Sequence, residues 1–161
     1  MANASKPCKE CGGEVKLTTL GSFRGEEGPV AVIVNGMPAL VCGNNHKRFV
    51  SNEFVANLMD FVANPEAVAP QPPATRRGFF RRRYHCSECD AELPWEPARK
   101  AERGLDASFK NAAPFKIVVQ VALYKCEGCG REQVLSNEDV AGSAFKAVAH
   151  GFRAADIHTD R

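Results

Sequence analysis

The spacing of the cysteines constrains the fold of this chain more than any other feature. Six of the seven cysteines form three C-x-x-C pairs, and the seventh, Cys42, stands alone. A C-x-x-C turn brings two sulfurs close enough to share one metal ion, and a second such turn completes a tetrahedron. The second half of the chain therefore contains the ligands of a predicted four-cysteine zinc site: Cys86, Cys89, Cys126 and Cys129.

The first half supplies three cysteines and needs a fourth ligand of another kind. Cys8 and Cys11 form a pair, and Cys42 follows them. His46 stands four residues after Cys42, where an imidazole can reach the same ion. The eight ligands then fill two sites, so we expect two Zn²⁺ ions per chain. If His46 is not a ligand, the first site has three cysteines and an open position or an external ligand.

Other cysteine chemistries fit the pattern less well. A redox C-x-x-C motif normally occurs alone near a βαβ pattern, whereas this chain repeats its pairs. An iron–sulfur cluster favours four cysteines, and the first set includes a histidine. A catalytic zinc keeps an open position for water, which four protein ligands do not leave. Structural zinc is therefore the expected chemistry of both sets.

The cysteine count also bears on the cellular compartment. Residues 1–7 contain no hydrophobic signal region, and no apolar run approaches the roughly 18 residues of a membrane helix. We therefore expect a cytoplasmic protein with no membrane partner. Disulfides rarely persist in that reducing compartment, and cysteine pairs there more often bind metal.

The two halves of the chain follow the same plan. Residues 8–15 and 86–93 both fit C-x-E-C-x-x-E followed by an aliphatic residue, and a β-rich stretch and a further ligand motif come next. Each half then reaches Ser-Asn-Glu, at 51–53 and 136–138, before an amphipathic pattern. Gene duplication is the simplest explanation, and convergent zinc-ribbon geometry is the alternative.

This plan predicts a small β-rich zinc-binding fold of the α+β class, with tandem zinc ribbons that are each followed by an amphipathic helix. The first ribbon and its helix occupy residues 1–63, and the second occupy residues 78–161. Residues 64–77 include a proline-rich stretch and are expected to form a semi-rigid linker. Since each half is too small to bury a large core, we expect the zinc ions to contribute to folding.

Local patterns predict individual elements. Helical spacing places Phe54, Val55, Leu58, Met59 and Val62 on one face, and Val140, Ala141, Ala144, Phe145, Val148 and Phe152 on another. Ser136 and Asp139 resemble a capping box with Asp in place of Glu. Asn35-Gly36, between the apolar runs 30–34 and 37–42, predicts a β-hairpin. Residues 115–124 predict one long strand, and residues 96–110 a short helix.

Residues 8 to about 62 resemble the YgiT-type zinc finger, the N-terminal domain of a class of bacterial toxin–antitoxin antitoxins. The matching features are Cys8-x-x-Cys11, the run from Val32 through Asn35-Gly36 to Cys42, and Ser51 with Glu53 before the helix. Where the family has a second C-x-x-C, this chain has Cys42-Gly-Asn-Asn-His46. The resemblance covers about a third of the chain and implies a zinc ribbon that contacts a protein partner. The family's DNA-binding helix-turn-helix domain has no counterpart here, so the antitoxin role does not carry over.

One segment suggests a different partner. Five arginines, without any acidic residue, alternate with aromatic residues between positions 76 and 84: Arg76, Arg77, Arg81, Arg82 and Arg83. Such a segment can bind phosphate and stack on bases. The alternative is a solvated linker end whose Phe79, Phe80 and Tyr84 pack on the second ribbon. The whole-chain charge does not favour a polyanion, because metal-bound thiolates lower the formal charge from +2 to about −1.

The expected function follows from two saturated metal sites. The sequence contains no nucleophile-and-base pattern, phosphate-cradling glycine loop or paired catalytic carboxylates. We therefore expect a non-catalytic adaptor or regulator with a protein partner and no small-molecule substrate. A nucleic-acid-binding regulator that uses residues 76–83 is the alternative, and a metalloenzyme is the third and least favoured hypothesis.

Overall fold

Alternating apolar residues build the centre of the molecule. The computed structural model describes residues 6–68, 71–110 and 112–159. In β9 (Phe115–Lys125), Phe115, Ile117 and Val119 are buried and the residues between them are exposed or partly exposed. β9 pairs antiparallel with β3 (Val30–Asn35), and both strands contribute their buried side chains to the same core. The predicted strand at residues 115–124 is confirmed.

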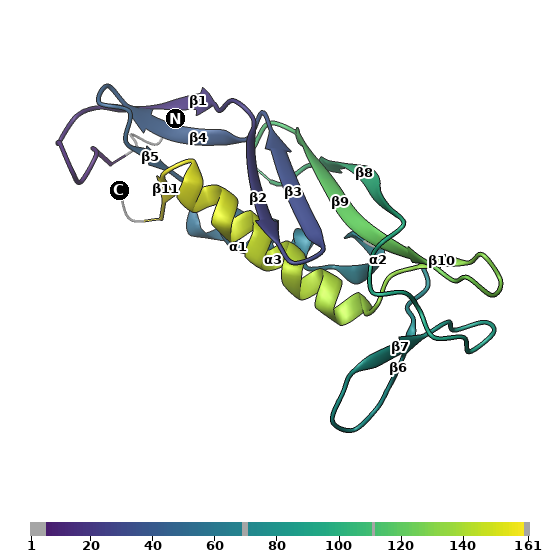
Figure 1. Ribbon diagram of the computed structural model, residues 1–161. Helices are drawn as coiled ribbons and strands as arrows, with labels where there is room; N and C mark the ends of the chain where they lie inside the picture. Colours follow the sequence, from purple (N-terminus) through teal and green to yellow (C-terminus); the bar gives the residue numbers. More distant parts are fainter. Residues whose placement is uncertain (1–5, 69–70, 111, 160–161) are drawn as a thin grey trace.

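The described strands form three sheets, and this pair lies in the largest of them (Figure 1). The largest contains β3 and β9 together with β2 (Phe23–Glu27), β8 (Arg99–Ala107) and β10 (Glu132–Gln133). The second contains β1 (Val15–Thr19), β4 (Pro38–Cys42), β5 (Lys47–Arg48) and β11 (Ile157–His158), of which β11 runs parallel to β5. The third is a hairpin of β6 (Thr75–Arg77) and β7 (Arg83–His85).

Two serines begin the two longer helices. The Ser51 hydroxyl accepts a hydrogen bond from the backbone N–H of Phe54 (3.1 Å) before α1 (Asn52–Val62). Ser136 accepts from the N–H of Asp139 (3.3 Å) before α3 (Asn137–Ala154), so the predicted cap at Ser136 is confirmed. A short helix, α2 (Pro65–Val68), follows α1. Each cap satisfies a backbone donor that the first helical turn leaves unpaired.

The buried faces of α1 and α3 are those that the helical spacing predicts, with one exception. α1 buries Phe54, Leu58 and Val62. α3 buries the predicted apolar residues apart from Phe145, whose exposed fraction is 44%. Ala147 is fully buried instead.

The halves of the chain share one hydrophobic core. Phe54 of α1 contacts Phe109 and Phe115, with ring centroids 5.6 and 5.8 Å apart. Phe152 of α3 contacts Phe23 and Phe49 in the same way, at 5.8 and 4.7 Å. The helix of each half therefore packs against aromatic residues of the other half. The ribbons do not have separate cores, and the boundaries 1–63, 64–77 and 78–161 stay a prediction.

The halves also approach each other closely at Gly25 on β2. A Cβ atom built there would lie 1.7 Å from the carbonyl oxygen of Ala147 and 2.6 Å from the backbone nitrogen of Gly151. Real atoms do not approach so closely, so only glycine allows α3 to lie on β2 in this way. In Figure 1, α3 runs along the sheet in front of β2 and β3.

Two predicted elements are wrong. Residues 96–110 contain β8 rather than a helix, because pairing with β9 along nine residues overrides the local helical preference. The Asn35-Gly36 hairpin is absent as well: β3 pairs with β2 and β9, and β4 pairs with β1 and β5. Gly36 has a φ of 74°, but Asn35 is not left-handed, so the turn is not of the tight hairpin type and instead passes the chain from one sheet to the other.

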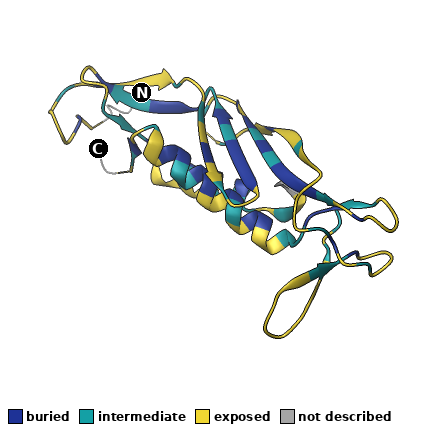
Figure 2. Ribbon diagram, in the orientation of Figure 1, coloured by how far each residue is buried: buried dark blue, intermediate teal, exposed yellow. Residues whose placement is uncertain are grey.

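The predicted linker contains regular structure. It includes α2 and all of β6, and its residues 69–70 lie outside the described part of the chain. Figure 2 shows that burial is concentrated between the sheet and the helices, while the β6–β7 hairpin extends from the body and is largely exposed. Among the described residues, none of the helices has the length and apolarity required to cross a membrane.

Candidate metal centres

Three turns with one hydrogen-bonding pattern position the C-x-x-C pairs. In each, the N–H of the first cysteine donates to the carbonyl five residues later, at Gly13, Ala91 or Arg131 (2.7–2.9 Å). The N–H four residues after that cysteine donates back to its carbonyl. The donors are Gly12, Asp90 and Gly130, and each has a positive φ of 65–80°. This backbone pattern turns both sulfurs of a pair to the same side.

The turn at Cys42 is one residue shorter. The N–H of Cys42 donates to the carbonyl of His46 (3.1 Å), and the N–H of Asn45 donates to the carbonyl of Cys42 (3.0 Å). The positive φ is at Asn45, three residues after the cysteine rather than four. The second side chain of this turn that faces the cluster is therefore that of His46. Its imidazole reaches the position that the second cysteine of a C-x-x-C pair occupies in the other turns.

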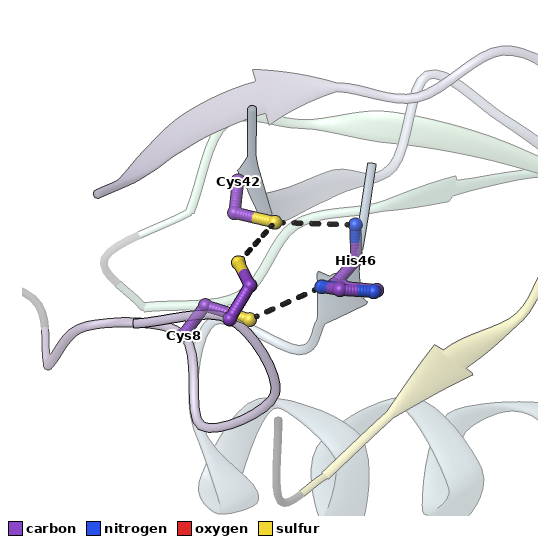
Figure 3. Close-up of side chains that lie close together, drawn as sticks. Cys8, Cys42 and His46 are labelled. Atoms are coloured by element: carbon purple, nitrogen blue, oxygen red, sulfur yellow. Dashed lines mark hydrogen bonds between the residues drawn. The ribbon is translucent and has the colours of Figure 1, made fainter. Parts of the chain in front are cut away.

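The structure brings together the four residues predicted for the first site (Figure 3). Their ligand atoms all lie within 4.8 Å of one another. Nδ1 of His46 lies 3.4 Å from Sγ of Cys8, and Sγ of Cys11 lies 3.7 Å from Sγ of Cys42. Cys8 and Cys42 are buried, Cys11 is exposed and His46 is half-buried. The group could hold a metal ion.

The environment of the first cluster favours a metal-binding state. Nε2 of His46 lies 3.0 Å from a carboxylate oxygen of Glu10, which leaves Nδ1 directed at the sulfurs. A carboxylate in this position fixes the orientation of a ligating imidazole. The backbone N–H of Gly13, and then the side chains of Asn44 and His46, lower the pKa of Cys11 to about 6. Burial raises the pKa of Cys8.

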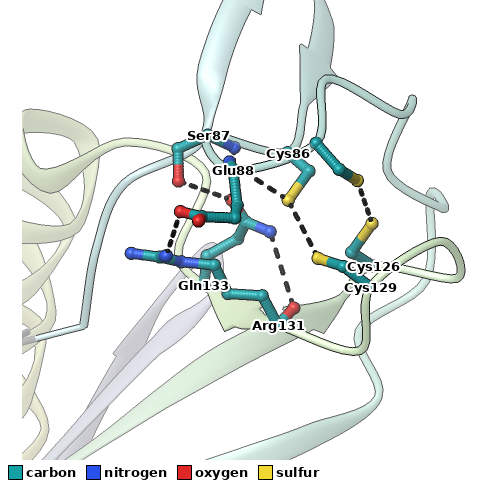
Figure 4. Close-up of polar contacts among 8 residues, drawn as sticks. Cys86, Ser87, Glu88, Cys126, Cys129, Arg131 and Gln133 are labelled. Carbon is teal, nitrogen blue, oxygen red and sulfur yellow. Dashed lines mark hydrogen bonds and ion pairs between the residues drawn. The ribbon is translucent and has the colours of Figure 1, made fainter.

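The four cysteines predicted for the second site also meet (Figure 4). Cys86 and Cys89 precede β8, and Cys126 and Cys129 connect β9 to β10. Sγ of Cys86 lies 3.6 Å from Sγ of Cys129, and Sγ of Cys89 lies 3.4 Å from Sγ of Cys126. All four sulfurs lie within 4.8 Å of one another, and the group could hold a second metal ion.

A buried amide connects the two turns of the second cluster, and the sequence analysis did not identify it. Oε1 of Gln133 accepts hydrogen bonds from the backbone N–H and the hydroxyl of Ser87 (3.1 and 3.4 Å). Its Nε2 donates to the carbonyl of Arg131 (3.5 Å). Among the described residues, Gln133 is the one polar side chain that is fully buried. The sequence feature that could have indicated Gln133 is its position directly before the apolar pair Val134-Leu135.

Gln133 also affects the thiols. Its side chain is the main reason that the pKa of Cys86 is lowered to about 6, and the backbone N–H of Cys89 contributes next. An ion pair across the same turns joins Arg131 to Glu88 at 2.8 Å (Figure 4). The neutral amide and this exposed ion pair hold the two C-x-x-C turns at a fixed separation.

The predicted arginine segment lies beside the second cluster and contributes no ligand to either cluster. Arg76 and Arg77 belong to β6, Arg83 belongs to β7, and Arg81 and Arg82 lie in the loop between them. All five are exposed. The alternative in which the aromatic residues pack on the second ribbon is right for Tyr84, which packs with Cys86, Leu93 and Cys126, and wrong for the two phenylalanines, which are exposed.

A groove of about 430 Å³ opens beside the second cluster. It lies between the ends of β3 and β9 and the start of α3. Its walls are mostly apolar: Pro29, Val30, Ala31, Pro97, Ala122, Leu135 and Val140. Glu26, Lys100 and Asp139 place charges of both signs along it, and Tyr84 and Tyr124 lie at the end nearer the cluster.

No protein-family model, curated protein or solved structure matches this chain. The likeness of residues 8–62 to the YgiT-type zinc finger therefore rests on the motifs alone. The features that bear on function are the two clusters and the surfaces around them.

Proposed function

We propose that both clusters bind zinc and that the protein is a non-catalytic adaptor that recognises a protein partner. The donor sets support the choice of metal, since thiolates and imidazole are the ligands of structural zinc. Two sulfurs bound at about 2.3 Å to a tetrahedral ion lie about 3.8 Å apart. The sulfur–sulfur distances of 3.4–3.7 Å are close to that value.

The number of protein ligands supports a structural role. Each cluster offers four ligand atoms, one from each of its residues. Four ligands fill a tetrahedral zinc site and leave no position for a reacting water or substrate. This closure is the observation that carries the proposal. The ions would instead contribute folding free energy to turns that have little core of their own.

The groove supports a protein partner. Its apolar walls with a few charged groups match the way in which an interface buries an apolar centre behind a polar rim. An extended peptide segment with apolar side chains fits this surface better than a charged ligand does, because charges of both signs line it. The resemblance to a zinc finger that contacts a protein partner agrees with this proposal.

Metal analysis and spectroscopy test the closed sites. We expect two zinc ions per chain, and a cobalt-substituted protein with the strong visible absorption of tetrahedral sites. Adding azide or cyanate should leave that spectrum unchanged, since no ligand position is open. A spectral shift on adding either anion would reveal an exchangeable position and favour a metalloenzyme.

Site-specific photo-crosslinking in cells tests the partner. A crosslinking amino acid in place of Lys100, at the groove, should capture a discrete protein, and one in place of the exposed Lys16 on β1 should not. Ala31→Trp fills the groove and should abolish the adduct. Ala56→Trp, on the exposed face of α1, is the matched control. Identical adducts from both crosslinking positions would rule out the groove.

A further inference from the structure

The β6–β7 hairpin is an arm with a defined tip. We call residues 75–85 the arm and residues 78–82 its tip. The strands pair from Thr75 with His85 to Arg77 with Arg83, and the arm extends from the body beside the second cluster (Figure 1). Gly78 has a φ of 107°, and a Cβ atom there would lie 2.1 Å from the carbonyl oxygen of Arg81. The tip therefore closes tightly, in a conformation that glycine alone allows.

The tip presents two aromatic rings to solvent. The exposed fractions of Phe79 and Phe80 are 98% and 99%, the highest among the large hydrophobic side chains described. Their ring centroids lie 6.0 Å apart and the ring planes meet at 57°. Since the rings contact each other at an angle and touch little else, their outer faces remain free. Two such rings at the end of an arm form a small platform on which flat groups can stack.

Charge pairing divides the five arginines into two sets. Arg77 pairs with Asp90 at 2.7 Å, and Arg83 pairs with Glu92 at 3.8 Å. Both acidic residues belong to the segment that contains the first C-x-x-C turn of the second cluster. The two pairs therefore connect the strands of the arm, at the end next to the tip, to that segment. Arg76, Arg81 and Arg82 form no ion pair within the described residues, and all three are exposed. Arg81 and Arg82 lie in the tip with the two rings, and Arg76 lies in β6.

The arm has a net positive charge, whereas the rest of the chain is net negative. The formal net charge of the chain is +2, and the arm's five arginines account for more than all of it. The remaining residues carry a formal charge of −3, before the thiolates add to it. An anion is therefore attracted to the arm and repelled by the rest of the surface.

We propose that the arm binds single-stranded nucleic acid. The Arg76, Arg81 and Arg82 guanidinium groups contact phosphates, while the Phe79 and Phe80 rings stack on unpaired bases. A single strand offers both groups to so narrow a tip, and its bases are already unstacked. A duplex would have to be opened first. An anionic membrane has the same charge as nucleic acid, but its extended surface would also face the negatively charged body.

Fluorescence anisotropy with the metal-loaded full-length chain tests the proposal. The probes are labelled 12-nucleotide RNA and DNA oligomers of mixed sequence, as single strands and as duplexes, at several salt concentrations. Three phosphate contacts predict a log–log salt dependence with a slope of about −2 for single strands. Phe79→Ala and Phe80→Ala should each weaken single-strand binding by about tenfold.

Matched variants separate the arm from general effects. Phe145→Ala removes an exposed phenylalanine of α3 and should leave binding unchanged. Arg81→Gln and Arg82→Gln should each make the salt slope shallower by about 0.7. Arg103→Gln, which changes an exposed residue of β8, should alter the slope little. Because the substituted side chains are all exposed, these variants should keep two metal ions and an unchanged melting temperature. Ala31→Trp should bind the oligomers normally, since the groove is a separate surface.

Three results would overturn the proposal. The first is the absence of salt-dependent binding to either single strand. The second is tighter binding to the duplexes than to the single strands. The third is binding to vesicles of phosphatidylglycerol that requires Phe79 and Phe80, without binding to the oligomers; it would assign the arm to a membrane surface.

Discussion

The two metal clusters share a C-x-x-C turn but differ in how their tetrahedra are completed. The second cluster uses two turns of identical hydrogen bonding. The first combines one such turn with a shorter one, in which the left-handed residue is Asn45 rather than the residue after it. The comparison shows that the backbone turn selects the ligand: a one-residue contraction replaces a sulfur with the longer reach of His46.

The clusters also differ in what supports them. Beside the first cluster, β5 pairs with β11, and the Lys47 ammonium donates to the carbonyl of Ala155 (3.2 Å). The first cluster is thus stabilised by the C-terminal part of the chain. The two turns of the second cluster are joined by the buried amide of Gln133 and by the exposed Arg131–Glu88 ion pair, beside a small apolar cluster. The first cluster is therefore supported by strand pairing with the C-terminal part of the chain, and the second by side chains of its own turns.

The largest expected effect comes from removing a buried ligand. Cys42→Ser and Cys126→Ser should each leave one metal ion per chain and lower the free energy of unfolding by several kcal/mol, about half of a typical domain's stability. Because the halves share a core, each variant should unfold in one transition when followed by circular dichroism. Two separate transitions would show that the ribbons are independent after all.

A smaller effect should follow from changing His46. His46→Ala should weaken metal binding at the first cluster by more than the 10–100-fold typical of an outer partner, since it removes one of four ligands. His46→Cys should restore little, because a thiol is too short for the contracted turn. Competition titration with a chelator measures both variants. Full affinity in His46→Cys would contradict the proposed role of the shorter turn.

The next effect concerns the support of the second cluster. Gln133→Leu leaves the N–H of Ser87 without its acceptor and should cost about 1–3 kcal/mol in the free energy of unfolding. Ser87→Ala loses only the longer hydroxyl contact of 3.4 Å and should change stability little. Urea titration distinguishes the two. Equal stabilities would mean that Gln133 fills space without connecting the turns.

The smallest effect is expected at Glu10. Its carboxylate and the His46 ring are both partly exposed, so solvent weakens their interaction. Glu10→Gln keeps an acceptor for Nε2 and should weaken metal binding at the first cluster by no more than about tenfold. The second cluster should be unaffected in this variant. Glu88→Gln, which removes a similar surface charge beside the second cluster, is its control.

Local patterns predicted local structure well. The Ser-Asn-Glu motifs locate both helix starts, since Ser51 and Ser136 act on donors only three residues away. The eight ligand candidates meet in two groups, as their spacing predicted. Residues 96–110 and Asn35-Gly36 were misjudged for the same reason. Their conformations depend on partner strands, and a local pattern does not reveal which partner a strand will find.

The sequence by itself determined the ligand types, the number of clusters and the starts of the helices, because the ligand count follows from residue types and each turn or cap depends on residues a few positions apart. Only the tertiary structure decided how the halves combine. The antiparallel pairing of β3 with β9 joins residues nearly ninety positions apart, and it places each helix against aromatic residues of the other half. Such pairing is selected by total burial in one core, which no short segment contains. The tertiary structure likewise separated Arg77 and Arg83, which pair with Asp90 and Glu92, from the three arginines of the arm that form no ion pair within the described residues.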